Sequence, residues 1–263
     1  MKNNNKANIS NNGCFSNKCL IYGKHPCFSV LKSRKRKVYD VFVMNKNKNE
    51  FLDFISENDI KLNDNIVKFV DSDKLDAIFP YQEKNHQGYI IFACEKERIT
   101  IDDFINSIDN KKELPKIILL DQILDPHNLG AIIRTAVAFG VMNIIVTSFN
   151  SVKDTPIVTK SSAGLSEVVN IIEVVNLNNT IKSLKDAGYF VVGLAGESKM
   201  TINEMTDSNN IALVLGNEGK GIRELVKKNC DYLVKIKMDS CAESLNVSVA
   251  SALAMYELWG RGL

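Results

Sequence analysis

From residue 116 onward, short continuous apolar runs alternate with longer stretches in which apolar residues recur at helical spacing. The apolar runs predict buried strands, since they are short and rich in Ile, Val and Leu. Strands are expected at residues 117–121, 143–147, 171–175, 189–194, 211–215 and 232–237, and helices at 129–139, 177–187, 221–229 and 245–258. Fully apolar strands separated by helices predict an α/β domain with a mostly parallel sheet covered on both faces.

The chain before residue 98 has shorter elements. Strands are expected at residues 38–43, 66–70 and 89–93 and a helix at 50–58, which together predict a small α/β domain over residues 19–97. Residues 98–115 are mostly polar and predict a linker to a second domain of residues 116–263. Residues 1–18 are rich in Asn and Lys and poor in apolar side chains, which predicts a disordered tail.

Composition agrees with a globular chain. With 263 residues, 45% of them hydrophobic and 24% charged, the chain is long enough for two cores. No apolar run approaches the length of a membrane span, and the N-terminal segment lacks the apolar stretch of a secretory signal. A cytoplasmic protein is therefore expected.

The six cysteines and three histidines do not predict a metal site. The cysteines form no Cys-x-x-Cys pair, and the histidines lie far apart in the sequence. Reduced thiols and no metal cofactor are expected. The formal net charge of +2 is too small to indicate a nucleic-acid partner by itself, so local groups of residues must carry that argument.

Three loops carry the candidate chemistry, and each follows a predicted strand and precedes a predicted helix. In a parallel sheet such loops lie at the carboxyl edge, where ligands bind. The first, Asp-Pro-His-Asn-Leu-Gly at residues 125–130, offers Asn128 as a helix N-cap. Arg134 follows on a helix that is otherwise apolar, where an arginine snorkels, pairs with an acid or binds a phosphate.

The second loop, residues 216–221, has three glycines in six residues with Glu218 between two of them. Its spacing matches neither the Walker A loop nor the dinucleotide-binding loop. The third loop runs from Ile236 to Asn246 and offers Ser244 as an N-cap. Ser, Asn, Arg and Glu without a Cys or His nucleophile do not form a hydrolase triad, and suit the positioning of groups in a transfer reaction.

The three loops together resemble the motifs of the SpoU/TrmH family of S-adenosylmethionine-dependent RNA ribose 2′-O-methyltransferases, in the SPOUT superfamily. The matching stretches are Asp-Pro-His-Asn-Leu-Gly with Arg134, Gly-Asn-Glu-Gly-Lys-Gly at 216–221, and Ser-Leu-Asn-Val-Ser-Val-Ala at 244–250. Tyr-Gly-x-His at 22–25 and His-Gln-Gly at 86–88 also resemble marks of the L30e-like substrate-binding domain found in the subgroup that modifies a guanosine of large-subunit (23S) rRNA.

The resemblance implies a fold, a cofactor and a set of roles. It implies a trefoil knot in the C-terminal domain, a homodimer, and S-adenosylmethionine as methyl donor. The implied catalytic residues are Asn128, Arg134, Glu218, Ser244 and Asn246, and the implied donor-binding residues are Gly216, Ile236 and Leu245. Lys237 and Ser240 depart from the family, which often has Pro and Gly there. The identity of the general base is left open.

Alternatives remain for the substrate and for activity. A tRNA ribose methyltransferase is a rival, although the small domain with its His-Gln-Gly mark favours rRNA as the partner. An RNA-binding assembly factor without catalysis is another, although all five catalytic-type residues are present. The basic run at residues 34–37 is read either as a solvated face or, in view of the resemblance, as part of an RNA-contacting face.

Overall fold

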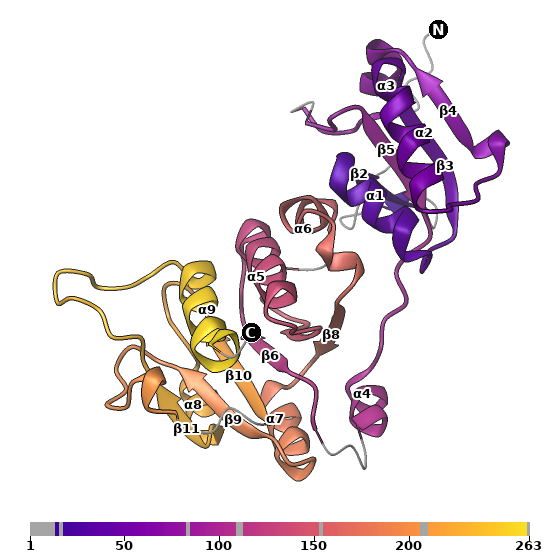
Figure 1. Ribbon diagram of the computed structural model, residues 1–263. Coiled ribbons are helices and arrows are strands. Elements are labelled where there is room, and N and C mark those ends of the chain that lie inside the picture. Colours follow the sequence, from indigo (N-terminus) through magenta and orange to yellow (C-terminus); the bar gives the residue numbers. More distant parts are fainter. Residues whose placement is uncertain are drawn as a thin grey trace, which may run out of the picture. The chain divides into compact units, whose positions relative to one another are not determined.

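The computed structural model describes residues 14–15, 18–82, 85–108, 113–152, 155–205 and 210–261. The chain forms two compact units (Figure 1). One comprises Met1–Glu97 together with Asp154–Val168, and the other comprises Arg98–Lys153 together with Val169–Leu263. The sequence predicted a single passage from the first domain to the second, so the assignment of Asp154–Val168 to the first unit is a structural finding.

The first unit is built on a five-stranded sheet. Its strands, in spatial order, are β1 (Cys14–Phe15), β2 (Lys18–Tyr22), β5 (Tyr89–Ala93), β3 (Val38–Met44) and β4 (Val67–Val70). All neighbours are antiparallel except β3 and β4. Helices α1 (Lys24–Ser33) and α2 (Lys48–Glu57) contribute buried residues to a core on one face, and α3 (Ser72–Ile78) contributes to a core on the other. Short 3-10 turns, η1 (Asn45–Asn47) and η2 (Asp64–Ile66), complete the connections.

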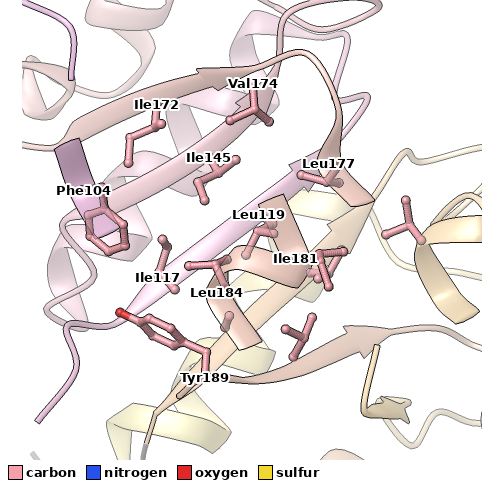
Figure 2. Packing of buried hydrophobic residues seen from close by; sticks show 14 of the residues in the cluster. Phe104, Ile117, Leu119, Ile145, Ile172, Val174, Leu177, Ile181, Leu184 and Tyr189 are labelled. Carbon is pink, nitrogen blue, oxygen red and sulfur yellow. The ribbon is translucent and has the colours of Figure 1, made fainter. Parts of the chain in front are cut away.

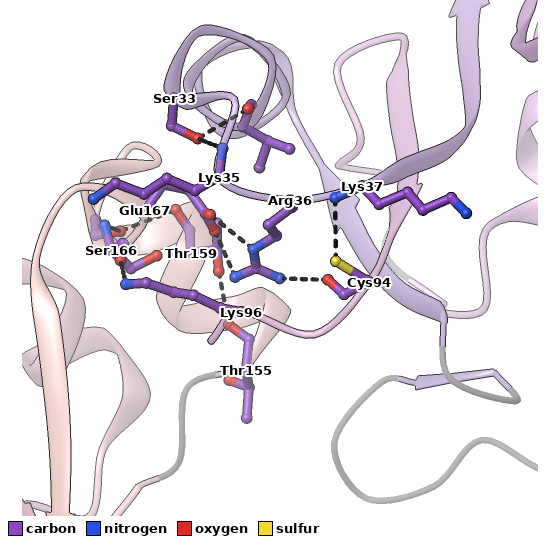
Figure 3. Close-up of polar contacts among 12 residues, drawn as sticks. Ser33, Lys35, Arg36, Lys37, Cys94, Lys96, Thr155, Thr159, Ser166 and Glu167 are labelled. Atoms are coloured by element: carbon purple, nitrogen blue, oxygen red, sulfur yellow. Dashed lines mark hydrogen bonds and ion pairs between the residues drawn. The ribbon is translucent and has the colours of Figure 1, made fainter. Parts of the chain in front are cut away.

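The same unit contains α6 (Pro156–Ser161) and the 3-10 turn η3 (Leu165–Glu167), which lie far along the chain. A buried ion pair joins them to the small sheet: Nε and Nη2 of Arg36 each donate to a carboxylate oxygen of Glu167 at 2.8 Å (Figure 3). The two side chains are 6% and 0% exposed. Gly164 approaches α1 so closely that a Cβ would lie 2.8 Å from the Cα of Pro26. This segment is therefore an integral part of the first unit.

The basic run at residues 34–37 does not present four free cations. Arg34 donates to the backbone carbonyls of Asn58 and Asp59, and Arg36 is buried against Glu167. Because Arg34 and Arg36 bind other groups of the protein, the structure does not support a role for these two side chains in contacting RNA.

The His86-Gln87-Gly88 stretch forms hydrogen bonds that connect separate parts of the small domain. His86 accepts from the Gly88 N–H and contacts Asp76, and the Gln87 side-chain oxygen accepts from the backbone N–H of Lys24 at the start of α1. Gly88 has a positive φ of 87°, and a Cβ there would lie 2.4 Å from the Asn47 side chain. The glycine is required by both its backbone conformation and this close approach.

The second unit is built on a six-stranded sheet in which every pairing is parallel. In spatial order the strands are β11 (Tyr232–Val234), β9 (Phe190–Leu194), β10 (Ile211–Gly216), β6 (Ile117–Asp121), β7 (Asn143–Thr147) and β8 (Asn170–Val174). The order reverses at β6, because the chain goes on to β7 and β8 on one side and places β10 on the other. Such a reversal is where ligands bind in open α/β sheets.

Helices cover both faces of this sheet. Helices α4 (Ile101–Ile108), α7 (Leu177–Asp186) and α8 (Glu224–Asn229) bury apolar residues in one core, shown in Figure 2. Helices α5 (Pro126–Ala138) and α9 (Val247–Met255) pack against each other, and α9 continues as the π-helical turn η5 (Tyr256–Gly260). The 3-10 turn η4 (Ile202–Glu204) precedes β10. The predicted linker therefore contains a helix, α4, whose Phe104 and Ile108 are buried in this core.

The α/β fold class predicted from the sequence is confirmed, and the predicted strands at 89–93, 117–121 and 143–147 match the observed bounds. The predicted tail lies largely outside the described residues, but Phe15 and Lys18 face each other in the β1–β2 pair. Cys27, Cys94, Cys230 and Cys241 are free thiols, as expected. The expectation is wrong for Cys19, which is disulfide-bonded.

Within the described ranges, no helix has the length and apolar character needed to cross a bilayer. The same residues contain no group of three or more His, Cys, Asp or Glu side chains placed to hold a metal ion.

Candidate active site

The first two candidate loops leave neighbouring strands. In the parallel register, Gly216 at the end of β10 stands beside Asp121 at the end of β6. The chain leaves β6 toward α5, and leaves β10 through the glycine-rich loop. Asn217 connects the segments that follow these two strands, because its side-chain amide donates to the backbone carbonyl of Gln122 at 3.0 Å. Both loops therefore lie at the carboxyl edge, as the sequence predicted.

Three of the predicted catalytic side chains form a hydrogen-bonded row. The Asn128 side-chain amide donates to Glu218, and the Asn246 amide donates to the Asn128 side-chain oxygen at 3.1 Å. The three residues come from three separate motifs, since Asn128 lies 90 positions before Glu218 and 118 positions before Asn246. The fold thus brings one residue of each predicted motif into direct contact.

The helix caps at the site differ from the prediction. The N-cap of α5 is Asp125, whose side chain accepts from the His127 N–H, and Pro126 occupies the first helical turn. The predicted cap Asn128 lies within α5, so its amide is free to bind Glu218. The N-cap of α9 is Asn246 and not Ser244, because the Asn246 side chain accepts from the Ser248 N–H at 2.9 Å.

The glycine-rich loop closes on itself. Asn217 and Gly221 exchange two backbone hydrogen bonds, of 3.1 and 2.8 Å, and the Asn217 side-chain oxygen accepts from the Gly219 N–H at 2.9 Å. A Cβ on Gly216 would lie 2.2 Å from the backbone of Gly221, so only glycine allows this closure. The turn leaves Glu218 exposed at its tip, where it contacts Asn128.

A pocket of about 170 Å3 lies beyond the carboxyl ends of β9, β10 and β11. The three predicted donor-binding residues, Gly216, Ile236 and Leu245, all line it. Glu218 and Ser244 of the predicted catalytic set line it as well. Its other walls are Leu194, Gly196, Leu215, Asn217, Gly221, Lys235, Met238, Glu243, Val247 and Ala250. The pocket is therefore mainly apolar and adjoins the Asn128–Glu218 contact.

Two of the predicted catalytic residues stand outside the hydrogen-bonded row. Arg134 is exposed on α5, and Ser244 is exposed before α9. Among the residues that the structure describes, neither side chain makes a hydrogen bond. Their exposure leaves both available to a ligand, whereas Asn128 and Asn246 are already held within the protein.

The third loop is held partly by Asp239. Its carboxylate accepts from the backbone N–H of Cys241 at 2.9 Å, and this hydrogen bond lowers the pKa of the Asp239 carboxyl below its ordinary value. Lys237 and Ser240, which depart from the family pattern, are exposed and are not among the residues lining the pocket.

The sequence reasoning missed one pair of residues at this edge. Asp121, fully buried at the end of β6, accepts from the backbone N–H and the guanidinium of Arg223. A charged residue ending an otherwise apolar strand was the available signal. Its partner was not evident, because Arg223 lies more than a hundred positions away in the sequence.

The second unit is thus a parallel α/β domain with a mainly apolar pocket beyond the carboxyl ends of β9, β10 and β11, lined in part by Glu218, whose partner row includes the amides of Asn128 and Asn246; this is the arrangement of a ligand-binding α/β domain. The chain belongs to the SpoU rRNA methylase family, whose model matches residues 115–256. A model described as RNA 2′-O ribose methyltransferase substrate binding matches residues 20–99. The resemblance recognised from the three motifs is thereby confirmed, and the protein is a methyltransferase.

Several curated relatives match nearly the whole chain. The 23S rRNA (guanosine-2′-O-)-methyltransferase RlmB of Coxiella burnetii is 35% identical over 90% of this chain and 94% of that protein. The putative TrmH family tRNA/rRNA methyltransferase YacO of Bacillus subtilis is 35% identical over 91% of this chain and 94% of its own length.

Solved structures share the fold. The SpoU methyltransferase AviRb from Streptomyces viridochromogenes, in complex with the cofactor AdoMet, has a TM-score of 0.74 at 21% identity and covers 94% of this chain and 91% of its own. An AdoMet-bound rRNA methyltransferase from Sinorhizobium meliloti has a TM-score of 0.75 at 20% identity and covers 94% and 89%. At these identities the likeness establishes the fold alone.

Proposed function

We propose that this protein transfers the methyl group of S-adenosylmethionine to the ribose 2′-hydroxyl of a guanosine in 23S rRNA. The observation that carries the proposal is the row formed by Glu218, Asn128 and Asn246 beside an apolar pocket. The name of the Coxiella burnetii relative supports the substrate, and family membership supports the reaction.

The residues of the pocket fit the methyl donor. Adenine is flat and largely apolar, and Leu194, Leu215 and Val247 supply apolar walls for it. At Gly196 and Gly221 a Cβ would meet nothing within 4 Å, so the absence of side chains there leaves room beside the backbone. We assign Gly216, Ile236 and Leu245 to donor binding. When bound, S-adenosylmethionine supplies a methyl group on a sulfonium whose thioether leaves without acid assistance.

The protein side chains then have to orient the ribose, hold its phosphate and let the 2′-hydroxyl lose its proton as its oxygen accepts the methyl group. The Glu218–Asn128–Asn246 row fixes two amides and a carboxylate beside the pocket, and such preorganisation is effective because the groups need not rearrange during reaction. Arg134 carries a permanent positive charge and is suited to the substrate phosphate. Ser244 at the pocket wall is assigned to hydrogen bonding with the substrate.

An rRNA substrate is preferred to tRNA because the substrate-binding model matches residues 20–99 and the 35% identical relative named for 23S rRNA spans 90% of this chain. A substrate of this kind implies that the protein acts in the cytoplasm, and we propose that location.

We also propose that the protein is a homodimer with a trefoil knot in its second unit, as the family resemblance implies. An apolar stripe on α9 and η5 supports the dimer: Val249, Leu253 and Tyr256 follow helical spacing and are 48%, 41% and 50% exposed. Large side chains of this kind in one row are typical of a covered surface.

The reaction is tested by transfer of labelled methyl from S-adenosylmethionine to 23S rRNA and, separately, to bulk tRNA, with the labelled nucleotide mapped. Arg134→Ala is expected to reduce transfer by on the order of a hundredfold, since it removes a phosphate contact that orients the nucleophile. Arg98→Ala is the control, because Arg98 pairs with Glu173 on β8, the edge strand opposite the pocket. Methyl on tRNA alone, or transfer unaffected by Arg134→Ala, contradicts the proposal.

The dimer is tested by light scattering after gel filtration. Leu253→Lys places a charge in the apolar stripe and is expected to yield monomers, because burying an unpaired ammonium is costly. Val175→Lys, at a side chain that is 75% exposed after β8, is the control and should remain dimeric. A monomeric wild-type protein excludes the proposed dimer.

A further inference from the structure

Asp121 is a buried carboxylate that, within the described part of the chain, is bound by a single residue, Arg223. Its side chain is 0% exposed. The backbone N–H of Arg223 donates to Oδ2 at 3.0 Å, and Nε and Nη2 of the same residue contact Oδ1, each at 2.8 Å. The Arg223 side chain is 46% exposed, so it reaches the buried carboxylate from the surface. A buried carboxylate is stable only with such donors, which makes this a specific anchor point.

The anchor lies where the glycine-rich loop closes. Asp121 stands beside Gly216 in the register of β6 and β10. The loop begins at Gly216 at the end of β10 and ends at Gly221, whose backbone lies against Gly216. The next residue, Ile222, is buried in the core. Arg223 follows Ile222. Asp121 therefore binds the residue that follows the end of the loop, Arg223, and lies beside the residue at which the loop begins, Gly216.

The tip of the loop packs little against the rest of the protein. Glu218, Gly219 and Lys220 are exposed, and a Cβ at Gly221 would meet nothing within 4 Å, so the tip has few packing contacts. Its internal hydrogen bonds close the turn but do not fix the turn relative to the sheet. That relation depends on the bond from Asn217 to the Gln122 carbonyl, on the contact between Glu218 and Asn128, and on the Asp121–Arg223 anchor.

We propose that Asp121 and Arg223 are positioning residues that hold loop 216–221 in the shape that binds the methyl donor. Neither residue lines the pocket, whereas Gly216, Glu218 and Gly221 do. The pair acts through this wall of the pocket. The inference rests on the proposed function for the identity of the donor.

Binding of S-adenosylmethionine to the full-length protein, measured by titration calorimetry, tests the pair. Arg223→Gln is expected to weaken donor binding about tenfold, equivalent to ~1.4 kcal/mol, and Arg223→Lys to weaken it less, since an ammonium retains part of the ion pair. In methyl-transfer kinetics the KM for the donor rises, while kcat at saturating donor stays within about threefold.

Lys185→Gln is the matched control. Lys185 contacts Asp231 at 2.8 Å, and Asp231 also accepts from the Val191 backbone N–H, so this aspartate too is held by a cation and a backbone amide, but it is 31% exposed and lies away from the loop. Donor affinity of Arg223→Gln within twofold of wild type, or an equal loss in Lys185→Gln, overturns the inference.

A ligand-free readout separates this inference from the proposed function. Amide hydrogen exchange at Gly219 and Gly221 is expected to be faster in Arg223→Gln than in wild type and unchanged in Lys185→Gln. If wild type does not bind S-adenosylmethionine, the proposed function fails, and the exchange rates still decide whether the pair positions the loop. Unchanged exchange in Arg223→Gln contradicts the positioning role.

Discussion

Asn246 has two structural roles in one side chain. Its oxygen accepts from the Ser248 N–H and so caps α9, and its NH2 group donates to Asn128. An amide is the side chain that combines an acceptor and a donor in this way, whereas the predicted cap, Ser244, is left without a capping bond. The motif therefore requires asparagine for a reason that a capping preference alone does not reveal.

Two substitutions separate these roles. Asn246→Ala removes both bonds and is expected to lower the free energy of unfolding by about 1 kcal/mol, the usual contribution of an N-cap. Asn246→Asp retains the capping acceptor but replaces the donor by a second oxygen facing Asn128. Its stability should remain near that of wild type while methyl transfer falls on the order of tenfold. Urea unfolding and the methyl-transfer assay measure the two effects, and full activity in Asn246→Asp would show that the Asn128 contact is dispensable.

At the scale of elements, apolar periodicity predicted the strands of the second unit well. Their positions are set by burial, which the sequence displays directly. The helix starts were predicted less well: α5 begins at Pro126 and not at residue 129, and α8 at Glu224 and not at residue 221. Several neighbouring side chains in each loop are able to cap, and the choice depends on backbone angles set by tertiary contacts.

The junction between β10 and its loop gives a prediction at this scale. Gly216→Ala places a Cβ 2.2 Å from the Gly221 backbone, so the strand and the returning loop must separate. A loss of about 1–3 kcal/mol in unfolding free energy is expected, together with weaker donor binding. In Gly196→Ala the new methyl meets no atom within 4 Å, so its stability should not change by this amount. Equal thermal stability of the two variants contradicts this account.

At the scale of the whole molecule, the sequence indicated two domains and which residues would meet at the carboxyl edge. It did not indicate that Asp154–Val168 joins the first unit. The reason is that Glu167 and Arg36 are 131 positions apart, and neither the acid nor the basic run shows by itself that it has a buried partner. The five predicted catalytic residues and the three donor-binding residues stay predictions until tested by substitution.

Arg36→Met removes the guanidinium that neutralises a buried carboxylate. A loss of about 3–5 kcal/mol is expected in the stability of the first unit, because the buried Glu167 carboxylate loses both hydrogen bonds from the Arg36 guanidinium and its positive charge. Lys68→Met is the control, since the Lys68–Asp40 pair is partly exposed and should contribute less than about 1 kcal/mol. Urea unfolding followed by hydrogen exchange in β3 and η3 measures both. Equal losses of unfolding free energy in Arg36→Met and Lys68→Met would contradict the proposal that the buried ion pair stabilises the first unit more than the exposed one.

The Asp154–Val168 segment limits how this protein can be recombined. A chimera that exchanges the chain up to Glu97 with that of a relative replaces Arg36 but keeps the native Glu167 and Gly164, which were shaped to the original partner. Residues up to Glu97 therefore cannot be exchanged as a self-contained domain. The first unit also needs residues 154–168, which lie within the sequence matched by the methylase model. Substitutions on the two sides of the Arg36–Glu167 contact should therefore have accumulated together in evolution. A chimera made in the laboratory must take both segments from the same protein.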